Sequence, residues 1–507
     1  MMNEITALPM HNGQAAAAAD VPVLAVADFR QAIVDAVNDG ARVASLFAQP
    51  RPSGGVRLFA VLAQDHQGTL EALAADVDDS YPAITPCCAE AHWFEREIAE
   101  QWGVRPDGHP WLKPIRFHAS YTGRDAWGRK PGAAIAPSVT NFFQIHGEEI
   151  HEVAVGPVHA GIIEPGHFRF QCHGENVFHL EISLGFQHRG IERRLTGGPD
   201  ARTIHYMETL AGDTTIGHTT AYCGIVEALA GVSVPARAQT LRGVALELER
   251  IANHVGDLGA LAGDVGYLPT MSYCGRIRGD FLNMTAQICG NRFGRGLVRP
   301  GGVAHDLDDS RIADLLKRLD AAEKDLAVAV NLLWNTPSVM NRFEETGTIC
   351  AGLAHEIGLV GPAARACGVD RDVRRDLAFG IFRFAHIPAS TWHTGDVFAR
   401  AYVRWLEIQQ SVEFIREQLG SLPGGPVKED APVLAPGKLA VSMVEGWRGE
   451  ICHTAMTDAA GRFCWYKVVD PSFHNWFGLA CALRNQQISD FPLCNKSFNL
   501  SYCGHDL

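Results

Sequence analysis

The residues that could hold a metal or move protons are abundant in this chain, but they follow no common ligand spacing. Nine of the 22 histidines lie between His146 and His218. Their spacings match no usual metal-ligand motif, and imidazoles on strands alternate between faces, so we expect structural or interface histidines. The thirteen cysteines include no Cys-x-x-Cys pair. Without a secretory signal they indicate a reducing compartment, with most thiols buried as small apolar groups.

Other familiar catalytic motifs are missing as well. The sequence has no Walker A, Gly-x-Gly-x-x-Gly, His-Glu-x-x-His or Gly-x-Ser-x-Gly pattern. These motifs carry phosphate cradles, zinc ligands and hydrolase nucleophiles. We therefore expect neither a nucleotide site nor a hydrolase nucleophile.

Bulk composition narrows the function classes. A length of 507 residues suggests two or three domains. The formal charge of −13 argues against a nucleic-acid partner, because neutralising phosphates needs a basic face. No apolar run reaches the ~18 residues that a bilayer crossing needs, so we predict no transmembrane segment. Residues 1–20 lack the features of a signal peptide, and we expect a disordered leader there.

The elements needed to position a site are predicted in two blocks. In the first block, residues 28–40 and 92–104 read as helices and residues 56–64 as a strand. This pattern predicts an α+β domain over residues 21–118. The Gly- and Pro-containing stretch at 122–138 indicates a linker over residues 119–150.

The second block, residues 151–507, is predicted to be mainly α-helical with a small β-sheet at its start. Apolar and polar residues alternate after residue 148, which is typical of short strands. Helical spacing of apolar residues follows over 237–261, and further helices are predicted at 310–334 and 395–419. Strand-like pieces lie around 441–444 and 464–469.

The first block resembles one component of a respiratory complex. The residues that carry the resemblance are WFEREIAEQWGV at 93–104 and GHPWLKPIRF at 108–117. Together they resemble the C subunit of bacterial NADH–quinone oxidoreductase (complex I).

The second block resembles the D subunit of the same complex. It resembles even more closely the large subunit of energy-converting [NiFe] hydrogenases of the formate hydrogenlyase and hydrogenase-4 type. The matching stretches include GPVHAGIIEPGHFRF at 156–170, GFQHRGIERRL at 185–195, LERIANHVGDLGAL at 248–261 and DFPLCNKSFNLSYCGHDL at 490–507. The fusion of these two parts in one chain, in this order, is typical of the formate hydrogenlyase type.

The resemblance also shows what this sequence has lost. A [NiFe] centre needs two Cys-x-x-Cys pairs, because soft thiolates hold both metals. Here the first pair falls on Ala211 and Thr214, and the second on Ser501 and Gly504. Cys503 lies one residue off that register. We therefore expect no metal bound by this chain.

The quinone ligands that the resemblance to complex I implies are replaced too. In the D subunit a histidine turn near the start of the domain supplies one ligand. That turn reads GIIEPGH here, which puts Glu164 at the histidine's place and His167 three residues further on. The position of the second ligand, a tyrosine, corresponds to Gly212. Both expected quinone ligands are thus absent, although quinone stays a candidate ligand.

Six polar residues are expected, by resemblance, to converge on one cavity. We assign Glu164, Asp213 and His218 to a proton relay, and His167, Thr214 and Ser501 to the cavity lining. A buried carboxylate such as Asp213 is expected to have a raised pKa unless it is paired. The alternative is that Asp213 caps a helix or pairs with an arginine such as Arg193 or Arg194.

The resemblance implies a peripheral-arm subunit on the cytoplasmic face of the inner membrane. Its partners would be a small iron–sulfur subunit, a ferredoxin-like subunit and antiporter-like membrane subunits, and those partners would hold the iron–sulfur clusters. The chain would help to pass electrons to quinone or another acceptor, coupled to ion translocation. The alternative is a catalytically silent scaffold of such a complex. An active hydrogenase with unorthodox ligands is a third interpretation.

Overall fold

The N-terminal part of the chain is a sheet covered by two helices. The computed structural model describes residues 7–130, 132–161, 163–431 and 433–507. Strands β4 (Arg42–Pro50), β5 (Val56–Gln64) and β6 (Thr69–Val77) are antiparallel neighbours, and β3 (Val23–Leu24) runs parallel to β6. Helices α1 (Val26–Asn38) and α2 (His92–Trp102) pack on this sheet. The helices and the strand predicted in this part are confirmed within a few residues.

Helix α2 is buried on all sides, including its charged residues. Glu95 accepts hydrogen bonds from the backbone N–H groups of Ile84 and Thr85. The Lys467 ammonium, from strand β16 (Phe463–Val469) near the end of the chain, lies 2.6 Å from both carboxylate oxygens of Glu97. Buried charges persist only when they are paired, so these contacts let a polar helix join the two parts of the molecule.

The leader is ordered from residue 7 onwards, which corrects the disordered segment that we expected over 1–20. Strand β1 (Leu8–Met10) pairs with β6, and β2 (Ala15–Ala17) pairs with β14 (Lys438–Gly446) of the second part. Between them Asn12, which is buried, donates to the carbonyls of Leu377 and Met443. The segment is ordered because its backbone pairs with two sheet edges and the Asn12 side chain anchors it to the backbone of Leu377 and Met443. Residues 1–6 lie outside the described part of the chain.

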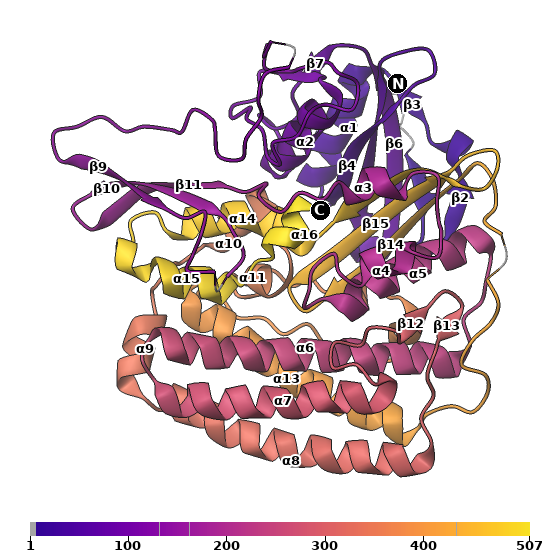
Figure 1. Cartoon of the computed structure of the whole chain (residues 1–507), viewed down its shortest axis with the longest axis vertical. Helices are drawn as coiled ribbons and strands as arrows, with labels where there is room; N and C mark the ends of the chain where they lie inside the picture. Colours follow the sequence, from indigo (N-terminus) through magenta and orange to yellow (C-terminus); the bar gives the residue numbers. More distant parts are fainter. Residues whose placement is uncertain (1–6, 131, 162, 432) are drawn as a thin grey trace.

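A long irregular segment follows the N-terminal part. Residue 131 aside, the structure has no helix or strand between β8 (Arg105–Asp107) and β9 (Ile150–Val155). Figure 1 shows this segment looping from the N-terminal sheet out to β9. Strands β9, β10 (His167–His173) and β11 (Asn176–Ser183) then form an antiparallel sheet. This is the small sheet expected at the start of the second block; the domain limits at 118 and 150 stay a prediction.

A second sheet lies in the interior of the later part. Its order is β16-β15-β14-β2, with β15 at Gly449–Thr457. Helix α5 (Thr215–Ala230) packs on β14 and β15. Every residue of β15 is buried. A strand buried on both faces does not alternate apolar and polar residues, which explains why the sequence pattern did not predict it.

Four long helices form the layer on the other side of α5. They are α6 (Ala236–Asp264), α7 (Leu268–Cys289), α8 (Asp309–Trp334) and α13 (Val397–Gly420), and Figure 1 shows them running side by side. The apolar residues that predicted α6, among them Leu241, Ile251 and Leu258, are buried. In the described residues, no helix has both the length and the apolar character needed to cross a bilayer.

Shorter elements connect these layers. They are β7 (Ser80–Pro82), α3 (Ile191–Leu195), α4 (Thr203–Met207), β12 (Val298–Arg299), β13 (Gly302–Val303), α9 (Pro337–Phe343), α10 (Ala351–Glu356), α11 (Gly361–Arg365), α12 (Val373–Asp376), α14 (Pro471–Ala482), α15 (Phe491–Phe498), α16 (Tyr502–Asp506) and the 3-10 helices, of which η4 (Gly380–Arg383) matters below.

Candidate functional site

Three of the six predicted site residues line one cavity. This cavity, which we call the acidic cavity, has a volume of about 740 Å³ and is bordered by Glu164, Asp213 and Ser501. They come from the turn before β10, the loop before α5 and the start of α16. The remaining lining residues are Phe186, Gln187, His188, Arg189, Thr209, Gly212, Arg278, Phe293, Arg295 and Cys503. The structure thus brings together segments more than 300 residues apart, as the distance from Glu164 to Cys503 along the chain (339 positions) shows.

Asp213 forms a two-point ion pair with Arg448, a residue that sequence reasoning missed. The Arg448 Nη1 and Nη2 atoms lie 2.6 and 2.7 Å from the two carboxylate oxygens of Asp213. The Arg448 guanidinium also lies over the Trp447 ring, 3.9 Å from its centroid. Burial alone would raise the pKa of Asp213, but Arg448 outweighs it and the pKa is lowered from its ordinary value.

This result corrects the expected raised pKa of Asp213. The alternative of an arginine partner was right in kind, but the partner is Arg448 and not Arg193 or Arg194. Arg448 lies 235 positions further along the chain, on the turn between β14 and β15. No local sequence signal could have linked the two residues.

Glu164 and Ser501 both act at the start of α16. The backbone N–H groups of Tyr502 and Cys503 lie 3.3 Å from the Glu164 carboxylate. The Ser501 hydroxyl caps the helix by accepting from the Gly504 N–H at 2.9 Å. Burial and the nearby Glu164 charge raise the pKa of Cys503 to about 11, so this thiol stays protonated at neutral pH.

His218 lies outside the lining of the acidic cavity, in a fully buried chain of hydrogen bonds. Its Nε2 is 3.0 Å from Asp470 Oδ2, and its Nδ1 is 3.1 Å from His453 Nε2. His453 Nδ1 is 2.8 Å from the Tyr466 hydroxyl. All four side chains are at most 1% exposed. We call this set, Tyr466, His453, His218 and Asp470, the buried relay.

The donors of the buried relay can all point in one direction. Burial raises the pKa of Tyr466 and lowers the pKa of His453 well below its usual value. Tyr466 therefore donates to a neutral His453, which donates to His218, which donates to Asp470; this tautomer assignment follows from the network. Burial opposes ionisation of Asp470, but the hydrogen bond from His218 and the charge of Arg448 outweigh it and lower its pKa.

The other two predicted residues have different places. Thr214 is buried beside Asp213, where its hydroxyl donates to the Asp213 carboxylate at 3.1 Å and accepts from the Trp447 indole at 3.1 Å. His167 lies on β10 with its Nε2 3.2 Å from Arg169 Nε and its ring packed against Phe142. It is not among the residues that line the acidic cavity.

Glu249, on α6, is a second acid that the sequence did not single out. Its carboxylate accepts from the N–H groups of Ile216 (2.7 Å) and Gly217 (3.1 Å) at the start of α5. The pKa of Glu249 is raised to about 8. Burial raises it most and the charge of Asp213 adds to the rise, while the two N–H donors offset part of it. A glutamate on the polar positions of an amphipathic helix looks like a surface charge, so only tertiary packing reveals it.

Sequence comparison with known proteins finds matches to both parts of the chain. Residues 34–127 match the family described as the 30 Kd subunit of respiratory-chain NADH dehydrogenase, and residues 264–439 match the one described as its 49 Kd subunit. The carbon monoxide-induced hydrogenase of Rhodospirillum rubrum is 31% identical over 350 residues, which is 69% of this chain and 97% of that protein. The chain belongs to this family of NADH dehydrogenase and hydrogenase subunits.

Other members of the family match across most of the chain. Formate hydrogenlyase subunit 5 of Escherichia coli (strain K12) is 28% identical, over 83% of this chain and 76% of that protein. The C/D subunit of the NADH-quinone oxidoreductase of Bdellovibrio bacteriovorus is 27% identical, over 73% of this chain and 68% of that protein. The resemblance drawn from the sequence is confirmed, and both of these relatives are named as subunits.

The four positions where the resemblance implies metal-binding thiolates carry residues without a thiol here. Ala211 is buried, Thr214 bonds Asp213, and Ser501 caps α16. A Cβ atom on Gly504 would lie 2.7 Å from the Asp470 carboxylate, so a cysteine would not fit there without a shift. Across the described ranges, no group of three or more His, Cys, Asp or Glu residues is arranged to hold a metal ion.

Proposed function

We propose that this chain is a peripheral-arm subunit of a membrane-bound, energy-converting oxidoreductase and that it carries no [NiFe] centre. It accepts electrons from iron–sulfur clusters in partner subunits and supports their transfer to quinone or another acceptor in the acidic cavity, coupled to ion translocation. The observation that carries the proposal is the Asp213–Arg448 pair, because Asp213 lies between Ala211 and Thr214, the positions where the resemblance to [NiFe] hydrogenases implies the first thiolate pair.

The residues at the metal positions do not fit a [NiFe] centre. A methyl group, two hydroxyls already engaged in hydrogen bonds and a glycine offer no thiolate. The nearby Cys503 thiol, with its raised pKa of about 11, is also a poor ligand. A guanidinium held at 2.6 Å from Asp213 further disfavours a cation in this position, because like charges repel.

One proton source lies beside the cavity. Reduction of a quinone or a similar carbonyl acceptor takes up protons as well as electrons. Glu249, with a pKa of about 8, is protonated at neutral pH and lies close enough to Asp213 for the Asp213 charge to raise that pKa. It can give this proton to the acceptor. The buried relay ends at an ionised Asp470 beside Gly504 of α16, so it can accept a proton there but does not supply one.

The acidic cavity also has features that suit a carbonyl acceptor. Arg189, Arg278 and Arg295 border it and offer guanidinium donors, while Phe186 and Phe293 offer apolar surface. Aromatic faces with a few convergent polar groups are typical of small-molecule sites. The histidine and tyrosine that the resemblance to complex I implies are absent from the cavity, so we expect different groups to hold the acceptor.

Membership of the family supports a proposal for the partners and the location. Several relatives are named as subunits or components, among them the membrane-bound hydrogenase subunit alpha of Pyrococcus furiosus. We propose a small iron–sulfur subunit, a ferredoxin-like subunit and antiporter-like membrane subunits as neighbours on the cytoplasmic face of the membrane. The alternative function, a silent scaffold, keeps these contacts without chemistry in the cavity.

Substitution of the cavity acids separates the two functions. Glu164→Gln and Asp213→Asn are introduced singly, and turnover of the assembled complex is measured beside the amount of assembled complex. We expect turnover to fall by about a hundredfold with assembly retained, because Glu164→Gln removes a carboxylate that borders the acceptor and Asp213→Asn leaves the Arg448 charge unpaired beside it. Asp309→Asn, an exposed acid on α8, serves as the control. If both cavity variants turn over like the control, the scaffold function is correct.

A further inference from the structure

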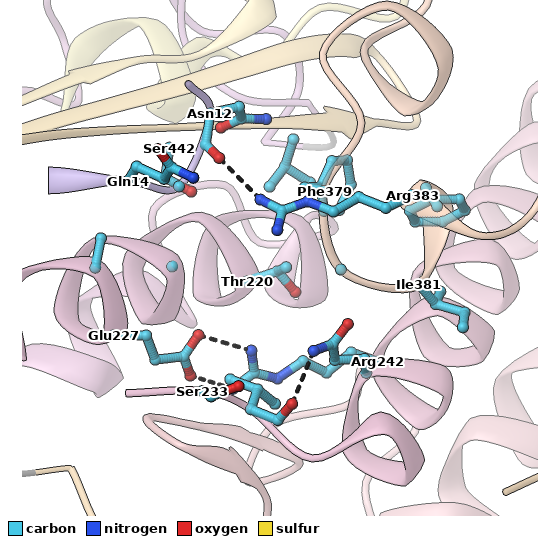
Figure 2. A pocket seen from close by; sticks show the side chains of 18 of the residues that line it. Asn12, Gln14, Thr220, Glu227, Ser233, Arg242, Phe379, Ile381, Arg383 and Ser442 are labelled. Atoms are coloured by element: carbon cyan, nitrogen blue, oxygen red, sulfur yellow. Dashed lines mark hydrogen bonds and ion pairs between the residues drawn. The ribbon is translucent and has the colours of Figure 1, made fainter. Parts of the chain in front are cut away.

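A second cavity lies between α5, α6, η4, β14 and the N-terminal segment. Its volume is about 510 Å³, within the range of roughly 300–1,000 Å³ that small-molecule sites occupy. It shares no lining residue with the acidic cavity. We call it the strap cavity, because residues 12–15 cross one side of it (Figure 2).

One wall of the strap cavity is apolar. Phe379, Ile381 and Phe382 line it from η4 and the residue before it, and Leu246 lines it from α6. Two helix glycines bring the walls together: a Cβ on Gly243 would lie 2.5 Å from Ile381 Cγ2. The other, Gly224, would collide with Ser442 Oγ at 2.5 Å. Such walls favour a ligand with a hydrocarbon or aromatic body.

One hydroxyl in this cavity is buried and lacks a partner. Thr220 is only 8% exposed, and its Oγ1 has no hydrogen-bond partner among the described residues. The residue lines the cavity, and Figure 2 shows it between Arg383 and Arg242. A buried hydroxyl without a partner is costly, so a ligand with a hydrogen-bonding group near the middle of its body would satisfy it.

The two arginines of the strap cavity differ in charge balance. Arg242 is neutralised, because its Nη1 and Nη2 atoms donate to the Glu227 carboxylate at 3.1 and 2.6 Å. Arg383 is exposed and donates only to the carbonyls of Asn12 (3.0 Å) and Ala378 (3.3 Å). In the described part of the chain, no carboxylate lies within ion-pair distance of Arg383. The cavity therefore carries one uncompensated positive charge at its edge.

The strap is built into the fold at both ends. Asn12 is fixed to Leu377 and Met443, and the Gly13 N–H donates to the Val441 carbonyl at 2.9 Å. The carbonyl of the same Asn12 accepts a hydrogen bond from the Arg383 guanidinium, so the strap also positions this charge beside the cavity (Figure 2). The charged wall is thus held by hydrogen bonds rather than by a mobile surface loop.

We propose that the strap cavity is a binding site for a small amphipathic organic anion. Its apolar body packs on Phe379, Phe382 and Leu246, a donor or acceptor in that body bonds Thr220, and its anionic group pairs with Arg383. The site is independent of the acidic cavity and of the electron transfer proposed there.

Binding of two matched probes to the purified full-length chain tests this site. Anilinonaphthalene sulfonate has an apolar body and one anionic group, and N-phenyl-1-naphthylamine has nearly the same body without the charge. Both are titrated by fluorescence against the parent chain, Arg383→Gln, and Lys324→Gln as a charge-matched control on α8. We expect saturable binding of both probes at a single site, and Arg383→Gln should weaken the sulfonate at least about tenfold while leaving the neutral probe nearly unchanged.

Filling the cavity is the second test. Ala228→Trp places a large side chain on the α5 wall and should abolish binding of both probes, with circular dichroism confirming the fold. Sulfonate binding that survives in folded Ala228→Trp, or that is weakened no more by Arg383→Gln than by Lys324→Gln, would overturn the proposal. If Ala228→Trp does not fold, the contrast between the two probes in Arg383→Gln decides alone, because Arg383 is exposed.

Discussion

Arg448 keeps Asp213 ionised at the border of the acidic cavity. The arginine side chain is 4% exposed and the aspartate side chain 34% exposed, so only one partner is fully removed from water. The pair is therefore expected to stabilise the fold more than an exposed salt bridge does but less than a fully buried one. It stabilises the loop before α5 against the turn between β14 and β15.

Removal of the arginine should leave a carboxylate without its partner. For Arg448→Gln we expect the free energy of unfolding to fall by about 2 kcal/mol, discounted from the roughly 3–5 kcal/mol of a fully buried pair. Urea denaturation measures it. The double variant Asp213→Asn/Arg448→Gln should recover part of the loss, and Arg318→Gln, from an exposed pair on α8, should cost little. An Arg448→Gln variant as stable as the parent would show that the pair contributes nothing.

Glu249 should make the free energy of unfolding depend on pH. Its pKa in the folded chain, about 8, is higher than its ordinary value, so the folded state binds the proton more tightly than the unfolded state. Between about pH 4.5 and 8 this residue therefore makes the protein less stable as pH rises. Glu249→Gln cannot ionise, so its stability relative to the parent should increase over that window, by about 1–2 kcal/mol after allowance for solvent screening.

Denaturation of both proteins at pH 5 and pH 8.5 measures this difference. Glu323→Gln, a partly exposed glutamate on α8 that pairs with Arg416, is the control substitution. A stability difference between Glu249→Gln and the parent that is constant with pH would contradict the protonated state of Glu249 at neutral pH.

At the scale of elements, the strap connects segments that are far apart in the sequence. Asn12→Ala removes three hydrogen bonds, two from its amide nitrogen and one to its amide oxygen. The loss leaves buried backbone groups of Leu377 and Met443 unpaired. We expect the free energy of unfolding to fall by about 2–3 kcal/mol and hydrogen exchange to rise in residues 8–17. His11→Ala, at an exposed neighbour, should change neither.

Elements with strong local patterns could be predicted from the sequence. The apolar spacing of α6, the strand at Val56–Gln64 and the end of α2 at Gly103 all follow local rules. The strap could not be predicted, because Asn12 bonds residues 365 and 431 positions away. In the site, Glu164, Asp213 and Ser501 were identified through family resemblance, whereas Arg448, Glu249, His453 and Tyr466 are defined only by tertiary contacts.

At the scale of the whole molecule, the N-terminal part and the second part of the chain also contact each other through buried ion pairs and strand pairing. Lys467 on β16 pairs with Glu97 on α2 and with Glu192 on α3, and all three side chains are at most 3% exposed. The leader adds one strand, β1, to the N-terminal sheet and another, β2, to the sheet that contains β14. Fusion of the two parts therefore yields one packed unit, in which the acidic cavity and the strap cavity lie at fixed positions relative to α5.

The whole assembly gives the most direct test of a cavity that works without nickel. The complex is purified from cells grown with ample nickel, its metal content is measured by mass spectrometry, and hydrogen evolution is assayed beside electron transfer to a quinone. We expect iron from the partner clusters, nickel far below one atom per chain, and electron transfer without hydrogen evolution. Stoichiometric nickel together with hydrogen evolution would contradict this account.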